Sequence, residues 1–119
     1  MLTSRRCLPG MLVLALLSGP LLLAGELATT KPAIKDPKRH DGFMADIKKM
    51  NGNIGLVFVG DSITDGWRGG GKAVWQKNFA AYKPLNIGIS GDRTEHVLWR
   101  LQNGELDGYQ ARLFVIMIG

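Results

Sequence analysis

Cysteine is nearly absent from this chain of 119 residues, in which the only one is Cys7. A single cysteine excludes an intramolecular disulfide framework. Cys7 also precedes the apolar run of residues 11–24, whereas a lipid-modified cysteine would follow such a run. The sequence has no internal repeat and no low-complexity segment, so repeat architectures are excluded as well.

Long hydrophobic segments are also scarce, because residues 11–24 form the one long apolar run and a Gly-Pro pair interrupts it. A membrane-spanning helix needs about 20 apolar residues. Arg5 and Arg6 precede the run and small residues follow it at 24–28, which is typical of a secretory signal peptide. We expect residues 1–28 to be this peptide, the mature protein to be secreted or periplasmic, and membrane contact to be limited to the peptide. An uncleaved anchor is the alternative.

A strong charge of either sign is missing too. The chain has 15 basic and 10 acidic residues, for a formal net charge of +5. Much of the basic excess lies in residues 31–49, where acidic residues are interspersed. This pattern is typical of a solvated surface, so we expect no nucleic-acid partner.

The residues after the predicted signal peptide divide into an arm and a domain. Residues 29–37 contain two prolines and show no apolar periodicity, so residues 29–40 are predicted to form a linker or a surface arm. Residues 41–50 place apolar side chains at helical spacing, and the Asn-Gly-Asn that follows predicts the end of a helix. The predicted domain therefore begins at residue 41 and continues to residue 119.

Strands and helices are predicted to alternate along the domain. Apolar runs rich in β-branched residues predict strands at 54–59, 85–89 and 113–118, with helices at 72–82 and 93–102 between them. This order is the α/β pattern of a parallel sheet covered on both faces. No helix follows the last strand, and three strands make a thin core. We therefore expect these residues to be the N-terminal portion of a larger domain.

Two polar turns follow the first and second predicted strands, at residues 60–62 and 90–92. Ligands of parallel α/β sheets bind beyond the carboxyl ends of the strands. A serine hydroxyl there becomes a nucleophile when a base accepts its proton and N–H groups stabilise the oxyanion. Ser62 could be that nucleophile, and Gly91 could approach closely because it has no side chain. The alternative is that Asp61 and Ser62 only cap a turn.

The longer pattern extends well beyond these turns. The segments GDSITDGW and LNIGISGDRTEHVLWRLQNGELDG, followed by a strand ending in MIG, resemble the SGNH (GDSL-type) hydrolases. Within that superfamily they are most similar to the branch of the platelet-activating-factor acetylhydrolase catalytic subunits, and the resemblance covers residues 54–119. It implies a flavodoxin-like three-layer α/β/α fold with a parallel sheet. It also implies hydrolysis of acetyl or short acyl esters, of lipid or carbohydrate, through a serine acyl-enzyme without cofactor or metal.

The resemblance assigns roles by position. Ser62 matches the nucleophile, whose N–H is also an oxyanion donor, and Gly91 matches the second donor. We also expect Asp61, which precedes the nucleophile, to be a supporting residue. Gly119 matches the first residue of the Gly-x-Asn block. The asparagine of that block and the Asp-x-x-His block, which supplies the general base, have no match in residues 1–119. We therefore expect the 119-residue chain alone to be inactive.

The remaining polar candidates are predicted to be structural. We expect His40 to lie on the surface of the arm and His96 to belong to the helical scaffold, and neither to act as the base. Asp65, the second acid after the first strand, is expected to cap a turn. Asp92 is expected to cap the helix at 93–102, with Glu95 completing a capping-box-like pair.

Two other classes of function remain as alternatives. Residues 66–73 (GWRGGGKA) match the phosphate-binding loop G-x-x-x-x-G-K, but Ala73 replaces the Ser or Thr that would hold Mg²⁺. The loop also does not leave the first predicted strand directly, so a nucleotide binder is the weaker alternative. The other alternative is a secreted fragment without catalytic activity.

Overall fold

The computed structural model describes residues 27–119. The predicted signal peptide, apart from its last two residues, lies outside the described residues. No helix within residues 27–119 is long and apolar enough to cross a membrane. The arm begins with a short 3-10 helix, η1 (Ala28–Thr30), and its residues are mostly exposed.

The first long helix, α1, comprises Pro37–Met50 and begins before the predicted start at residue 41. Asp36 is its N-cap, because Asp36 Oδ1 accepts the Arg39 N–H at 3.0 Å, and proline is favoured at the first helical position that follows. The earlier start places His40 on the inner face of α1, where it is 8% exposed. The prediction of a surface position for His40 is therefore wrong.

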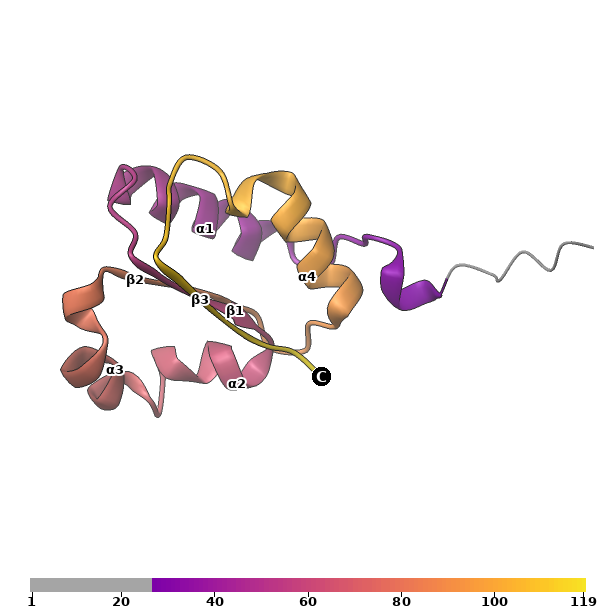
Figure 1. The fold of residues 1–119 in the computed structure, drawn as a ribbon. Helices are drawn as coiled ribbons and strands as arrows, with labels where there is room; N and C mark the ends of the chain where they lie inside the picture. The colour runs from indigo at the N-terminus through magenta and orange to yellow at the C-terminus, as the bar shows by residue number, and fades with distance from the viewer. Residues whose placement is uncertain (1–26) are drawn as a thin grey trace, which may run out of the picture.

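Three parallel strands form the sheet, as predicted. They are β1 (Leu56–Gly60), β2 (Pro84–Gly88) and β3 (Leu113–Met117), in the order β2-β1-β3 (Figure 1). Gly60 pairs with Gly88 on one side and with Met117 on the other. The carboxyl ends of the three strands are therefore level, at one edge of the sheet.

Helices cover both faces of β1 and most of β2, whereas all five residues of β3 are exposed. On one side lie α1 and α4 (Thr94–Arg100), and on the other lie α2 (Ser62–Asp65) and α3 (Lys72–Asn78), as Figure 1 shows. Short helical turns extend these helices: η2 (Gly66–Arg68), η3 (Ala80–Tyr82) and η4 (Leu101–Glu105). The result is the predicted three-layer α/β/α arrangement.

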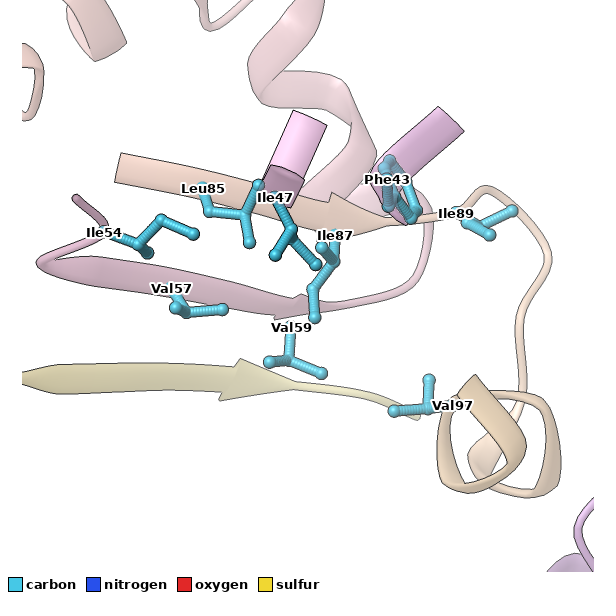
Figure 2. Close-up of a cluster of buried hydrophobic side chains, with 9 residues drawn as sticks. All are labelled: Phe43, Ile47, Ile54, Val57, Val59, Leu85, Ile87, Ile89 and Val97. Atoms are coloured by element: carbon cyan, nitrogen blue, oxygen red, sulfur yellow. The ribbon is translucent and has the colours of Figure 1, made fainter. Parts of the chain in front are cut away.

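The core occupies the space between the sheet, α1 and α4 (Figure 2). Alternate residues of a strand point to opposite faces of the sheet, so Val57 and Val59 of β1 point into this core. Its nine members are Phe43, Ile47, Ile54, Val57, Val59, Leu85, Ile87, Ile89 and Val97. On the other face, Phe58 contacts the rings of Trp67, Trp75 and Phe79. The five residues of β1 are all buried, which confirms the interpretation of its continuous apolar run.

Candidate active site

The serine turn begins where β1 ends. Gly60 leaves no room for a side chain, because a Cβ there would lie 2.1 Å from the Met117 carbonyl oxygen. Asp61 is the N-cap of α2, and its Oδ1 accepts the Ile63 N–H at 3.1 Å. Ser62 follows as the first residue of α2 and is exposed. Within residues 27–119 neither its N–H nor its hydroxyl donates to a protein group, so Asp61 alone is the cap.

The glycine turn follows β2. The Ile89 N–H donates to the Gly60 carbonyl at 3.2 Å, and the Asp92 N–H donates to the Ile89 carbonyl at 3.1 Å. Gly91 has a φ of 76°, in the left-handed region that favours glycine. No hydrogen bond within the described residues uses the Gly91 N–H. The two turns therefore present two unpaired backbone donors, those of Ser62 and Gly91, at the same edge of the sheet.

The end of β3 joins the serine turn through Asp61. Asp61 Oδ2 accepts the Gly119 N–H at 3.3 Å, while Oδ1 caps α2. One carboxylate thus connects the residues that follow the first and third strands. The three positions that the resemblance assigns to the site, Ser62, Gly91 and Gly119, all follow strand ends that the register places side by side.

Asp65 connects the serine turn with the glycine turn. Its Oδ2 accepts the Ser90 N–H at 3.1 Å and the Ser90 hydroxyl at 2.8 Å. Its Oδ1 accepts from Arg39 at 2.8 Å and from Arg68 at 2.6 Å. The prediction of a turn cap is therefore wrong, because Asp65 accepts from a different turn. The Asp65–Arg68 spacing of three residues was the one sequence signal for these contacts.

The hydrogen bonds from Arg39 and Ser90 also determine the charge state of Asp65. Burial by itself would raise the pKa of Asp65, but the hydrogen bonds from Arg39 and Ser90 outweigh it. They hold the pKa of this carboxyl well below its ordinary value. Asp65 is therefore an ionised acceptor at neutral pH, and it cannot serve there as a proton donor.

The two histidines are both occupied within the scaffold. His40 Nδ1 lies 2.8 Å from Glu105 Oε1. His96 Nδ1 accepts the Arg93 N–H at 3.0 Å, so that His96 caps the start of α4. Neither ring is hydrogen-bonded to Ser62 in the described part of the chain.

Asp92 does not cap α4, contrary to the sequence-based prediction, because Arg93 is the N-cap residue of that helix. Glu95 does not complete a capping box either, since His96 occupies that position. The Asp92 carboxylate is instead buried, and its Oδ2 accepts from Arg100 Nε at 3.0 Å. Arg100 also pairs with Glu105, which in turn contacts His40. This buried charge network (His40, Glu105, Arg100 and Asp92) connects α1 to the glycine turn.

The glycine-rich segment at 66–73 lies away from the end of β1. α2 separates it from the strand, and its first residues form the 3-10 helix η2. A phosphate-binding loop requires the loop to connect the strand directly to the helix that follows. Over residues 27–119 there is also no cluster of three His, Cys, Asp or Glu side chains that could hold a metal ion.

Comparison with known proteins adds a family to this geometry. Residues 58–119 match the GDSL-like lipase/acylhydrolase family. Over 80 residues the chain is 39% identical to platelet-activating factor acetylhydrolase IB subunit alpha1 of Rattus norvegicus, and it has the same identity to that of Homo sapiens. Over 81 residues it is 37% identical to subunit alpha2 of Homo sapiens. These matches cover 67–68% of this chain and 33–34% of the relatives, so the chain spans about a third of their length.

Proposed function

Because this chain belongs to the GDSL-like lipase/acylhydrolase family, we propose that it carries the nucleophile and two oxyanion donors of a serine esterase. Ser62 is the nucleophile, and the N–H groups of Ser62 and Gly91 are the donors. The observation that carries the proposal is the pair of unpaired N–H groups beside an exposed serine, at the edge where α/β sheets bind ligands.

The proposed reaction has two steps. Ser62 Oγ attacks the ester carbonyl carbon, and its proton passes to a general base that residues 27–119 do not contribute. The two N–H groups stabilise the negative oxygen of the tetrahedral intermediate, which collapses with departure of the alcohol. The alcohol takes up the proton as the acyl-serine forms. Water then attacks the acyl-serine, the acid leaves, and the Ser62 hydroxyl is restored.

Acetyl and other short acyl esters are the proposed substrates. The support is similarity to relatives whose names describe them as acetylhydrolases of platelet-activating factor. Esters of lipids and of carbohydrates both belong to this proposed class. We further propose that the protein acts outside the cytoplasm after removal of residues 1–28, on the strength of the signal-peptide pattern.

Ser62→Ala tests the proposed function. The assay uses the product of the complete reading frame with p-nitrophenyl acetate, and we expect kcat to fall by about a thousandfold or more. Tyr82→Phe, which removes an exposed hydroxyl beside β2, should leave kcat unchanged. A fluorophosphonate should phosphonylate Ser62 with loss of fluoride. Mass spectrometry should show the added mass in the wild-type protein and not in Ser62→Ala. Unchanged turnover in Ser62→Ala would refute the role of this serine.

The nucleotide-binding alternative predicts a different result. Lys72 would then contact phosphate, and Lys72→Ala would abolish ATP binding measured by calorimetry. The position of α2 between β1 and the glycine-rich segment argues against it. We expect no ATP binding in the wild-type protein.

A further inference from the structure

Two charged side chains from different segments hold Ser90, the residue before Gly91. Asp65 Oδ2 accepts both the backbone N–H and the hydroxyl of Ser90. Lys35 Nζ donates to the Ser90 carbonyl oxygen at 2.8 Å. Asp65 comes from the end of α2, and Lys35 comes from the arm before α1. Both backbone groups of Ser90 are therefore held by side chains from other segments.

The Lys35 contact has a direct consequence for the Gly91 N–H. The Ser90 carbonyl and the Gly91 N–H belong to one planar peptide unit, and no peptide bond in the described residues is cis. In a trans peptide the C=O and the N–H point in opposite directions. A donor that fixes the Ser90 carbonyl therefore also fixes the direction of the Gly91 N–H, which is one of the two unpaired donors of the site.

Asp65 fixes the preceding peptide unit in the same way. It accepts the Ser90 N–H, and Arg39 and Arg68 hold its other oxygen. Both guanidinium groups also donate to the Gly88 carbonyl, at 3.2 Å and 3.0 Å, where β2 ends. The Asp65 carboxylate is thus attached to the end of β2 as well as to Ser90.

Lys35 is itself anchored on the same turn. The arm that carries it is attached to α4, because the Ala33 N–H donates to the Glu95 carbonyl at 3.1 Å. Lys35 Nζ also lies 3.6 Å from Asp92 Oδ1, so it is close to a buried carboxylate. A Cβ at Gly91 would lie 2.9 Å from Lys35 Nζ. The absence of a side chain at Gly91 therefore gives the ammonium group room to reach Ser90.

We propose that Lys35 and Asp65 are positioning residues that hold the Ser90–Gly91 peptide so that the Gly91 N–H is directed at the oxyanion. This inference rests on the proposed function. An oxyanion donor lowers the barrier only when it is already oriented before charge develops, because otherwise its reorganisation cancels the gain. An unsupported glycine turn would allow the peptide plane to rotate.

Replacement of Lys35 gives the first test, again on the product of the complete reading frame. Lys35→Met keeps the length of the side chain and removes the donor to the Ser90 carbonyl, so we expect kcat to fall by about 10- to 100-fold. This is a smaller loss than the roughly 10²- to 10³-fold fall in kcat when an oxyanion donor itself is removed. KM and Tm should change little. Lys35→Arg still presents N–H donors to the Ser90 carbonyl and should recover most of the kcat. Lys38→Met removes an exposed lysine of α1 and is the matched control, with wild-type kcat expected.

Asp65→Asn provides the second test. The amide oxygen can accept either from the two arginines or from Ser90, but the amide NH2 group then faces the other donors, which it cannot accept from. We therefore expect kcat to fall as in Lys35→Met. Asp41→Asn, which removes an exposed carboxylate from α1, should have no effect.

An alkylboronic acid separates positioning from a merely structural role. The boron binds Ser62 Oγ with release of a proton, and the tetrahedral adduct places a negative oxygen at the oxyanion position. Its Ki should rise by about the same factor as kcat falls in Lys35→Met and Asp65→Asn, while KM stays constant. Fluorophosphonate labelling counts the molecules whose Ser62 is reactive. If kcat in the variants fell only in proportion to this labelled fraction, each labelled molecule would be fully active and the inference would be overturned.

The outcomes also separate this inference from the proposed function. If Ser62→Ala is inactive while Lys35→Met and Asp65→Asn keep the wild-type kcat and Ki, the inference alone is wrong. If Ser62→Ala remains active, the proposed function fails, and the inference fails with it because no oxyanion forms at Ser62.

Discussion

His40 Nδ1 and Glu105 Oε1 lie 2.8 Å apart, although 65 residues separate them in the sequence. Glu105 is completely buried, and its second oxygen pairs with Arg100 of α4. Burial raises the pKa of Glu105, against the lowering effect of Arg100 and His40. The contact joins α1 to η4, so it adds a polar link to the apolar packing of α1 through Phe43 and Ile47.

Removal of the Glu105 charge should therefore destabilise the fold. Glu105→Ala leaves the Arg100 guanidinium buried without this partner, and the loss of one member of a buried pair costs about 3–5 kcal/mol. Urea unfolding would measure the change in the free energy of unfolding. Asp107→Asn, which neutralises an exposed carboxylate nearby, should change it by less than about 0.5 kcal/mol. If Glu105→Ala behaved like Asp107→Asn, the buried network would contribute nothing to stability.

The sheet and its turns could be predicted because local pattern determines them. The run at 54–59 is continuously apolar and the one at 85–89 nearly so, and each is followed by a polar turn, which locates a buried parallel strand and its carboxyl end. Boundaries were predicted less accurately. α1 begins at Pro37 because Asp36 caps it. This local signal was present in the sequence, but the prediction relied on the apolar side chains, which begin only after residue 41.

The charged contacts could not be predicted, because each depends on a partner distant in sequence. His40 follows Lys38 and Arg39, a setting typical of exposed residues, but in the structure it is buried and lies beside the distant Glu105 carboxylate. Asp65 reaches Ser90 across 25 residues and Lys35 reaches it across 55. Side-chain periodicity describes which residues are apolar, but it does not specify which charged groups meet.

Acid should destabilise the protein partly through Asp65. Its pKa is lower in the folded state than the ordinary 3.8, so its contribution is present above about that pH and is lost as pH falls further. Asp65→Asn should lower the free energy of unfolding at neutral pH and flatten its decrease below that value. Urea unfolding measured across the acid range would show both effects. If the free energy of unfolding of Asp65→Asn decreased at acid pH as steeply as that of the wild type, the hydrogen bonds from Arg39 and Ser90 would not favour the ionised form of Asp65.

Alkaline pH should destabilise the protein through Tyr109. Its hydroxyl donates to the Glu105 carbonyl at 2.7 Å. Burial, together with the charges of Glu105 and Asp107, raises the pKa of Tyr109 from 10.0 to about 12. Because the folded state holds this proton more tightly, the contribution is complete below pH 10.0 and is lost as pH rises towards about 12. In a Tyr82→Phe variant, tyrosinate absorbance would follow the ionisation of Tyr109. The Tyr109→Phe variant should lack this Tyr109 absorbance change.

Alanine at Gly91 should impair activity more than stability. Gly91 and Gly108 both have positive φ, at 76° and 82°, so alanine at either position costs about 1–2 kcal/mol. Only Gly91 is at the proposed oxyanion site, where the added Cβ would also press against Lys35 Nζ. Kinetics and thermal unfolding should therefore show similar Tm losses for Gly91→Ala and Gly108→Ala, with a large fall in kcat for Gly91→Ala alone. Equal kcat values would argue against the donor role.

Asp61 offers a substitution that separates its two contacts. Its Oδ1 caps α2 through the Ile63 N–H, and its Oδ2 accepts the Gly119 N–H. Asparagine is as good an N-cap as aspartate, so Asp61→Asn can keep the Ile63 contact, but it has no second oxygen for Gly119. Asp61→Ala loses both contacts, and the loss of the cap alone costs about 1 kcal/mol.

We therefore expect Asp61→Asn to retain nearly the wild-type Tm and to lose part of its kcat, because Gly119 is then no longer held against the serine turn. Asp61→Ala should lose both Tm and kcat. Thermal unfolding and p-nitrophenyl acetate hydrolysis by the product of the complete reading frame would measure the two effects. Asp41→Asn is the control for loss of a carboxylate charge. Wild-type kcat in Asp61→Asn would show that the Gly119 contact is dispensable and that Asp61 acts only as a helix cap.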